Sequence, residues 1–435
     1  MRDKVKQSKS KAIEKVKCYF WKLYIFFGRR LLKRDGKTDV MIPYAKHDIS
    51  VDDIDAVLDV LENHFLTQGC KVPEFEKALC EYTSAQFCTA VNSATSGLHV
   101  ACLAAGVTQG DIVWTTPNSF VASANCALYC SAKVDFVDMD EHTRNIDVVK
   151  LGLKLTVAKQ AGQLPKALVV VHFAGFSCDM QAIANLLNGL DIVLIEDAAH
   201  GLGGSHHGRK IGGCEYSDMA VLSFHPVKSI TTAEGGAVLT NNPELAQKIL
   251  LFAKHGVTRD QNMFDAQTTN ISLTGDWYYQ QLTLGYNYRL SDMQAALGIS
   301  QLKKLDDFIE ARQQKANFYF QALANLPLIL PQQTNTDNQS GWHIFVIELK
   351  TQEGDGNRGQ TRKAVYDQLV GKGIGVNVHY IPIHLHPFYQ QLGFEYGDFP
   401  CAERYYERAI TLPLYPSLTQ QQQQAVVDAL TEILV

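Results

Sequence analysis

Apolar and polar positions alternate along most of the chain in a way that predicts strands and helices in turn. After Ser50, a suitable helix N-cap, the apolar residues Ile54, Val57 and Leu61 recur on one helical face. Strand-like runs follow at 87–91, 112–115, 133–137, 167–172, 192–196, 219–223 and 236–239, and helical patterns lie between them at 94–105, 119–130, 180–187 and 243–255. This alternation predicts an α/β fold with a mostly parallel central sheet that is covered on both faces.

The C-terminal part has a different pattern. Residues 257–284 have no clear period and predict a long loop, and helices are expected at 290–305 and onward to Leu323. The remaining elements are expected to be a strand at 342–349, a polar loop at 351–360, a helix at 362–372, a strand at 376–379 and a helix at 419–434. We therefore predict a large domain over 41–300, with an N-terminal arm at 41–85, and a smaller α+β domain over 301–435.

Charge is unevenly distributed. The net charge is −5, which argues against nucleic acid as a partner, but residues 1–40 hold 13 Lys/Arg and 4 Asp/Glu. This basic N-terminal extension has one aromatic segment, 18–27, that is too short to span a bilayer. It predicts either a dispensable addition before Met41 or a weak contact with a membrane surface. The ten cysteines form no C-x-x-C pair, which fits reduced thiols and a cytoplasmic location.

Two charged residues carry the main chemical signal. Asp197 follows a buried strand, and Lys228 lies 31 residues later in a turn. A carboxylate and a lysine in this order suit pyridoxal 5'-phosphate: the amine can form a Schiff base with the cofactor aldehyde, while the carboxylate keeps the pyridine nitrogen protonated. A structural salt bridge is the alternative explanation for Asp197.

Other motifs extend this picture. The run 92–97 follows a strand and opens a helix, which suits a phosphate cradle, although a simple N-cap explains Ser93 equally well. Phe120 could stack on a cofactor ring or serve as a core aromatic. Three histidines, 379, 384 and 386, have no carboxylate or cysteine at ligand spacing, so we predict no metal site.

Four motifs together resemble the DegT/DnrJ/EryC1/StrS sugar aminotransferases. They are 92–95, 196–200, 223–236 and 285–292, they occur in the family's order, and the resemblance extends over about residues 41–434. The resemblance implies a pyridoxal-phosphate-dependent transferase of fold type I, similar to aspartate aminotransferase. It also implies a homodimer with active sites at the interface.

The resemblance also implies roles for individual residues. Lys228 and Asp197 would be catalytic. The cofactor would be bound by Ala94, Thr95, Phe120, Asp197, His200, Ser223, Lys228 and Asn287. The substrate would be bound by Tyr44, His64, Phe65, Leu66, Thr67, Asn287, Arg289, His379, Tyr380, Ile381 and Pro382. Asn287 is expected to reach the phosphate region of the other subunit.

The segments 41–44, 64–69 and 378–383 resemble those of family members in pseudaminic acid synthesis. The implied reaction moves an amino group from L-glutamate to C4 of a UDP-linked 4-keto-6-deoxy-N-acetylhexosamine. Alternatives are a transaminase for another nucleotide 3- or 4-keto sugar, and a non-catalytic sensor that binds pyridoxal phosphate. A family dehydratase would have histidine in place of Lys228.

Overall fold

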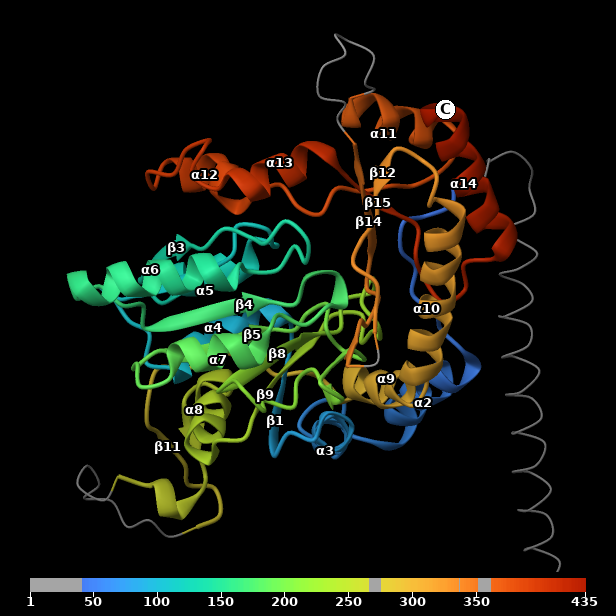
Figure 1. Ribbon diagram of the computed structural model, residues 1–435. Coiled ribbons are helices and arrows are strands. Elements are labelled where there is room, and N and C mark those ends of the chain that lie inside the picture. The colour runs from blue at the N-terminus through green and yellow to red at the C-terminus, as the bar shows by residue number, and fades with distance from the viewer. Residues whose placement is uncertain (1–40, 266–274, 336, 351–360) are drawn as a thin grey trace, which may run out of the picture. The chain divides into compact units, whose positions relative to one another are not determined.

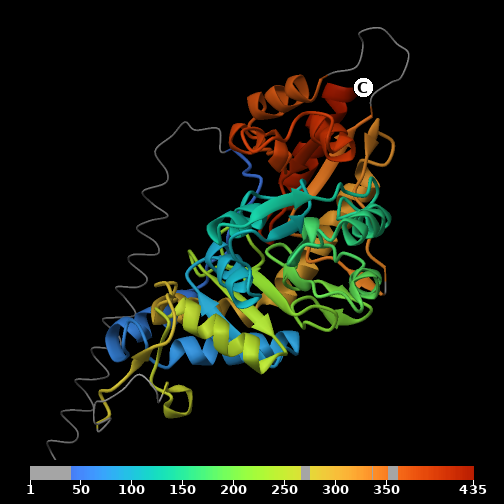
Figure 2. The ribbon, with the colours of Figure 1, turned by 90° about the vertical axis from the view of Figure 1, so that its left-hand side faces the viewer.

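The computed structural model describes residues 41–265, 275–335, 337–350 and 361–435. The predicted extension at 1–40 and the polar loop at 351–360 lie outside the described residues, as does the part of the 257–284 segment between 266 and 274. Residues 42–435 form one compact unit, shown in Figures 1 and 2. Within the described ranges, no helix combines the length and the hydropathy needed to cross a membrane.

A seven-stranded sheet forms the centre of this unit, with the strand order β1-β9-β8-β5-β4-β2-β3. Its strands are β1 (Phe87–Val91), β2 (Ile112–Thr115), β3 (Lys133–Phe136), β4 (Ala167–Val171), β5 (Val193–Asp197), β8 (Met219–Ser223) and β9 (Gly236–Thr240). Only β9 runs against its neighbours; the pairs from β8 to β3 are parallel. The mostly parallel sheet predicted from the sequence is confirmed.

Helices cover both faces of this sheet. They are α3 (Lys71–Thr83), α4 (Ala94–Ala104), α5 (Ala122–Tyr129), α6 (Val148–Ala161), α7 (Met180–Leu187), α8 (Pro243–Ala253) and α9 (Asp292–Leu302). One core places α4, α5 and α8 on one face. On the other face, α6 and α7 cover the β4 side, and α3 and α9 cover the β1 side. Successive side chains of each strand therefore point into different cores, as the pleat requires.

A second sheet, β12-β14-β15, is antiparallel and has its own apolar core. Its strands are β12 (Leu328–Ile329), β14 (Phe345–Leu349) and β15 (Ala409–Leu412), and its helices are α10 (Leu305–Ala322), α11 (Arg362–Gly371) and α14 (Gln420–Leu434). Figure 1 shows these helices beside the three strands, at the right of the view. This α+β arrangement agrees with the pattern predicted for the C-terminal part.

The remaining elements are short or peripheral. They are α2 (Val51–Asn63), β6 (Ser205–His206), β7 (Arg209–Lys210), β10 (Val257–Thr258), β11 (Gln280–Gln281), β13 (Asn338–Gln339), α12 (Pro387–Gln390), α13 (Pro400–Arg408) and the 3-10 turns η1 (Phe173–Gly175), η2 (Gln261–Met263) and η3 (Ile383–Leu385). The arm is tied to the C-terminal part, because Ile42 pairs with Ile374 and the Leu414 N–H donates to the Tyr44 carbonyl.

Three expectations about elements need correction. The predicted strand at 376–379 is extended chain that forms only an isolated bridge between Asn377 and Thr411, and the third strand of the sheet is β15 instead. Helix α5 begins at Ala122 rather than at residue 119. The described ends of 257–284 pair as β10 and β11.

Helix α6 is absent from the elements predicted from the sequence. Leu151 and Leu155 face the core, while Val149, Leu153 and Val157 are exposed. Its apolar residues therefore lie on opposite sides of the helix. A single apolar face, which would reveal the 3.6-residue period, is missing.

The contact between α3 and α9 depends on a small residue. A Cβ atom added at Gly298 would lie 2.6 Å from the Phe75 ring, which is fully buried. Asp292, at the start of α9, also accepts hydrogen bonds from the Gly69 and Lys71 N–H groups at 2.9 and 2.8 Å. The N-terminal arm is thus fixed on the large sheet by close packing and by one buried carboxylate.

We expect Gly298→Ala to lower the free energy of unfolding by about 1–3 kcal/mol, because the added methyl group overpacks this contact. Gly371→Ala is the matched control, since no atom lies within 4 Å of a Cβ at Gly371. Thermal denaturation of both variants checks this. Equal midpoints for the two variants would contradict the packing argument.

Candidate active site

A cavity of about 780 Å³ lies where several strands of the large sheet end. Asp197 is the last residue of β5, and Ser223 is the last residue of β8, the next strand in the sheet. Ligands in open parallel sheets bind beyond the carboxyl ends of strands. The cavity is also lined by residues from the arm and from the C-terminal part: Tyr44, His343, Asn377, Val378, His379, Tyr380, Ile381 and His386.

Lys228 reaches the cavity from the turn that follows β8. Burial lowers the pKa of its amine to about 8, and the Asp197 carboxylate acts in the opposite direction. The Nζ atom lies 3.4 Å from Nε2 of His343. A lysine with this pKa is partly neutral near pH 8 and can act as a nucleophile or a base.

Asp197 is held in place by two donors. Ser123 Oγ donates to Oδ2 at 2.6 Å, and the Ala199 N–H donates to Oδ1 at 3.1 Å. Because the Ser123 hydrogen goes to the carboxylate, Ser123 accepts the hydrogen bond from Ser119 at 2.7 Å. Asp197 forms no salt bridge within the described part of the chain, so its charge remains available to a cationic group in the cavity.

The hydrogen bonds around His200 define its tautomer. The Ala174 N–H donates to Nδ1 at 3.3 Å, so the neutral ring carries its hydrogen on Nε2, which lies 3.0 Å from the Tyr380 hydroxyl. Burial, with the nearby Lys228 and His379, holds the pKa of His200 well below its usual value. Tyr380 therefore accepts this hydrogen bond and keeps its own O–H to donate.

The start of α4 forms the polar end of the cavity. Ser93 is the N-cap, and Ala94 and Thr95 open the helix toward the cavity. A Cβ atom at Gly236 would lie 2.6 Å from the Ala94 nitrogen, so glycine lets β9 approach this turn. Helix N-termini bind phosphate through their free N–H groups and their dipole.

These residues fit pyridoxal phosphate. The helix start suits its phosphate, the buried carboxylate suits its pyridine nitrogen, and the Lys228 amine suits its aldehyde. Phe120 has 59% of its surface exposed and lines the cavity, which an aromatic residue can do to stack on a ring. No cluster of three or more His, Cys, Asp or Glu side chains capable of holding a metal ion occurs in the described ranges.

Most of the residues predicted from the sequence are brought together. Ala94, Thr95, Phe120, Asp197, His200, Ser223, Lys228, Tyr44, His379, Tyr380 and Ile381 all line this cavity. Burial, with a smaller contribution from Lys228, lowers the pKa of His379 to about 4, so this ring is neutral. The site residues thus surround the amine with neutral rings.

The other predicted residues lie outside the lining of this cavity. They are His64, Phe65, Leu66, Thr67, Asn287, Arg289 and Pro382. Phe65 is 79% exposed, and Asn287 is exposed as well. The contacts expected of these residues stay predictions. The resemblance assigns only Asn287 among them to the phosphate region of the other subunit.

Sequence reasoning missed three polar residues of the site. His343 reaches the cavity from the segment before β14, and Ser119 and Ser123 form the hydrogen-bonded chain to Asp197. His343 lies 115 positions from Lys228, and nothing local marks it. Nothing local marks Ser119 and Ser123 either, because Ser119 precedes the helix α5 that contains Ser123.

The fold and the cavity together define a transferase of fold type I that depends on pyridoxal phosphate. The family model of the DegT/DnrJ/EryC1/StrS aminotransferases matches residues 47–431. The chain belongs to this aminotransferase family.

Relatives and solved structures agree with this assignment. The UDP-4-amino-4,6-dideoxy-N-acetyl-beta-L-altrosamine transaminase of Campylobacter jejuni is 38% identical over 394 residues, 91% of this chain and 98% of the relative. The spore coat polysaccharide biosynthesis protein SpsC of Bacillus subtilis is 36% identical over 399 residues, 92% and 98% of the two chains. Helicobacter pylori PseC, an aminotransferase involved in the biosynthesis of pseudoaminic acid, superposes with a TM-score of 0.79 at 30% identity, covering 91% and 99%.

The pKa of Lys228 leads to a prediction about pH. The rate at which the apoprotein captures pyridoxal phosphate on Lys228 should rise with pH and level off above about 8, because only the neutral amine attacks the aldehyde. Stopped-flow measurement of the visible absorption band checks this. An inflection near 10.5, the ordinary lysine value, would contradict the proposed burial effect.

Removing the Asp197 carboxylate should shift the pH profile of pyridoxal phosphate capture by Lys228. Asp197 raises the pKa of Lys228 against the effect of burial, so Asp197→Asn should move the inflection to lower pH. Glu215→Gln is a control, because this exposed carboxylate pairs with Arg209 on the surface. A profile of Asp197→Asn that moved upward, or one of Glu215→Gln that moved equally, would disprove the electrostatic assignment.

Proposed function

We propose that this protein transfers an amino group from L-glutamate to C4 of a UDP-linked 4-keto-6-deoxy-N-acetylhexosamine, as in the synthesis of pseudaminic-acid-type sugars. The observation that carries the proposal is a buried, partly neutral amine at Lys228 facing the same cavity as the Asp197 carboxylate. Family membership supplies the reaction class, and the names of the Campylobacter and Helicobacter relatives supply the sugar.

Bound pyridoxal phosphate supplies an aldehyde that takes up the amino group and a ring that accepts the electrons left by a departing proton. In the first half of the reaction, the freed amine of Lys228 removes the α-proton of L-glutamate, and water then releases 2-oxoglutarate. In the second half, Lys228 returns a proton to C4 of the sugar and thereby fixes the configuration there. Asp197 holds the ring nitrogen protonated throughout both halves.

The neighbouring side chains assist Lys228 in different ways. Tyr380 has an O–H free to donate, because it accepts from His200. The neutral His343 imidazole lies within reach of the amine and can share its proton. Burial, with Lys228 as the largest electrostatic contribution, holds the pKa of His343 well below its usual value. The site therefore keeps one cation, at Lys228, near the reacting carbon.

We further propose a homodimer in which each subunit completes the other's site. Large apolar side chains near the predicted interface segments are exposed, including Phe65, Trp277 and Leu284 at 79%, 75% and 76%. Exposed apolar groups of this kind are typical of interaction surfaces. In the dimer, Asn287 and Arg289 would reach the partner's cofactor phosphate and substrate, and 64–67 would contact the nucleotide-sugar.

The domain boundary and the location are also proposals. We place the boundary between a large domain, 41–300, and a small one, 301–435, where the helices of the two cores meet. The cysteines in the described part of the chain are free thiols, which supports a cytoplasmic location. Weak contact of the basic extension with a membrane surface concerns residues outside the described ranges.

A second candidate is amination of another nucleotide 3- or 4-keto sugar. It is favoured by the equally extensive similarity to SpsC, whose name refers to spore coat polysaccharide. The non-catalytic sensor proposed from the sequence would bind the cofactor but leave L-glutamate unchanged.

The decisive experiment combines the cofactor-loaded protein with L-glutamate and a panel of UDP- and TDP-linked keto sugars. We expect 2-oxoglutarate and an amino sugar from the UDP-linked 4-keto-6-deoxy-N-acetylhexosamine. Turnover of a 3-keto sugar alone would favour the second candidate. Cofactor binding without 2-oxoglutarate release would favour the sensor.

Lys228→Ala should abolish turnover, with a loss of at least about a thousandfold, because among the described residues no other lysine lines the cavity to move the proton. Lys254→Ala is a control, since Lys254 lies at the end of α8 and is absent from the cavity lining. Product formation is followed by mass spectrometry. Turnover by Lys228→Ala at the unaltered rate would show that the assignment is wrong.

A further inference from the structure

Arg312 is a buried cation that has no carboxylate partner among the described residues. It lies on α10, and only 1% of its surface is exposed. Burial lowers the pKa of its guanidinium to about 10, which still leaves it charged near pH 7. Within the described part of the chain it forms no salt bridge, and its Nε atom has no hydrogen-bond partner. A charge placed in this way opposes folding unless something else compensates.

Three backbone carbonyls provide the compensation. Nη1 of Arg312 lies 3.1 Å from the Trp342 oxygen, 3.2 Å from the His343 oxygen and 2.9 Å from the Leu414 oxygen. Charged donors make stronger hydrogen bonds than neutral ones. The guanidinium therefore fixes two consecutive peptide groups, those of Trp342 and His343, against α10.

The chain at this point adopts a conformation that needs support. Trp342 has φ = 43°, in the left-handed region, where residues other than glycine are sterically strained. Its N–H donates to Ser340 Oγ at 2.9 Å, and its indole Nε1–H donates to Gln313 Oε1 at 2.6 Å. Gln313 follows Arg312 on the same helix, so α10 holds this turn from two adjacent positions.

The turn decides where His343 points. The His343 N–H donates to the Ala174 carbonyl at 3.1 Å, and its own carbonyl accepts from Arg312. With both peptide groups tied, the imidazole lies in the cavity with Nε2 3.4 Å from the Lys228 amine and its ring 4.2 Å from the His200 ring. Nδ1 of His343 has no partner in the described structure, so the ring is oriented mainly through its backbone.

We propose that Arg312 is a positioning residue for the aminotransferase reaction, an inference that rests on the proposed function. Through the carbonyls of Trp342 and His343 it holds the His343 imidazole against the Lys228 amine. It thereby sets the geometry in which that amine takes and returns a proton. Arg312 touches neither substrate nor cofactor, and its effect on the reaction passes through His343.

The test measures the half-reaction with L-glutamate under single-turnover conditions in the cofactor-loaded protein. Arg312→Met removes the charge and the hydrogen-bond donors but keeps an unbranched side chain of similar shape. Arg312→Lys keeps the charge and replaces Arg312→Met in the experiment if that variant does not fold. We expect the limiting rate to fall about tenfold to a hundredfold, as for a misplaced catalytic group. The glutamate concentration at half-saturation should stay nearly constant. With glutamate deuterated at Cα, the Arg312 variant should show a larger kinetic isotope effect on this rate than the unaltered protein.

A double-mutant cycle separates positioning from general stability. His343→Asn removes the imidazole, and adding Arg312→Met to it should cause little further loss, because the positioned group is already gone. Arg408→Met is the control. It breaks the ion pair between Arg408 and the buried Glu348 and should lower the melting temperature without changing the half-reaction.

Each result decides the question. Additive losses in the cycle, or an unaltered limiting rate in a folded Arg312 variant, would overturn the positioning role while leaving the aminotransferase assignment intact. A half-reaction that Arg408→Met slows as much as Arg312→Met would also overturn it, since the loss would then reflect stability. If the unaltered protein releases no 2-oxoglutarate from L-glutamate, the proposed function itself fails, and the role of Arg312 fails with it.

Discussion

The chemistry of this protein depends on burying one lysine amine beside one carboxylate at the edge of a sheet. Burial lowers the pKa of Lys228 to about 8, while Asp197 keeps the amine from losing its charge entirely. Neighbouring parallel strands, β5 and β8, make the arrangement possible, because their carboxyl ends open on the same side of the sheet. Hydrogen bonds to Asp197 from Ser123 and the Ala199 N–H then hold the carboxylate without neutralising it.

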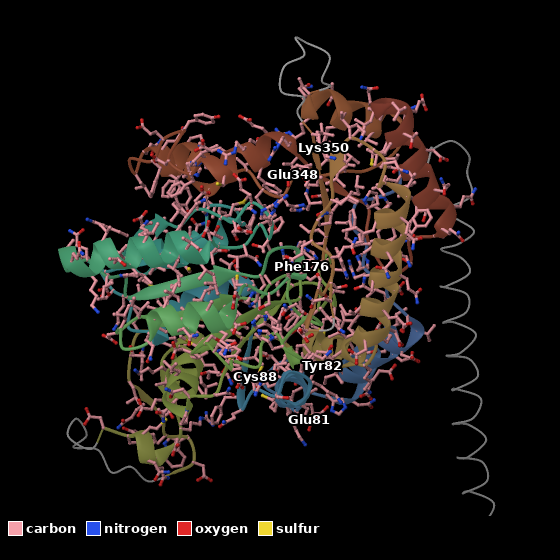
Figure 3. The ribbon with its side chains drawn as sticks, in the orientation of Figure 1. Glu81, Tyr82, Cys88, Phe176, Glu348 and Lys350 are labelled. Atoms are coloured by element: carbon pink, nitrogen blue, oxygen red, sulfur yellow. The ribbon has the colours of Figure 1, made fainter. Side chains whose placement is uncertain are left out.

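The other residues of the site are arranged so that this amine is the main charged group in the cavity. His200, His343 and His379 are held neutral by burial and by the amine itself. Figure 3 labels Phe176 and Glu348 near the strands of the C-terminal sheet, whereas Glu81 and Tyr82 lie on α3. The segment before β14 contributes His343 to the cavity lining, and Arg312 on α10 donates hydrogen bonds to the carbonyls of this segment.

Much of the large sheet could be predicted from the sequence because its strands and helices have local signals. The apolar runs at β4 and β8 are buried on both faces, and most helices show one apolar side or a clear N-cap such as Asp179. The prediction failed where the signal was not local. Helix α6 has apolar residues on two sides, and the segment at 376–379 forms only an isolated bridge between Asn377 and Thr411 of β15.

By itself, the sequence indicated the cofactor and, through the resemblance of its motifs to the family, the reaction class. The amine, the carboxylate and the helix start that suits phosphate lie in short motifs whose order and spacing are visible in one chain. Only the tertiary structure decided which distant residues surround the amine. His343 is 115 positions from Lys228, and Arg312 acts on it from a third segment. The physical reason is that pKa values and side-chain directions depend on burial and on contacts between remote segments. A sequence pattern does not encode these locally.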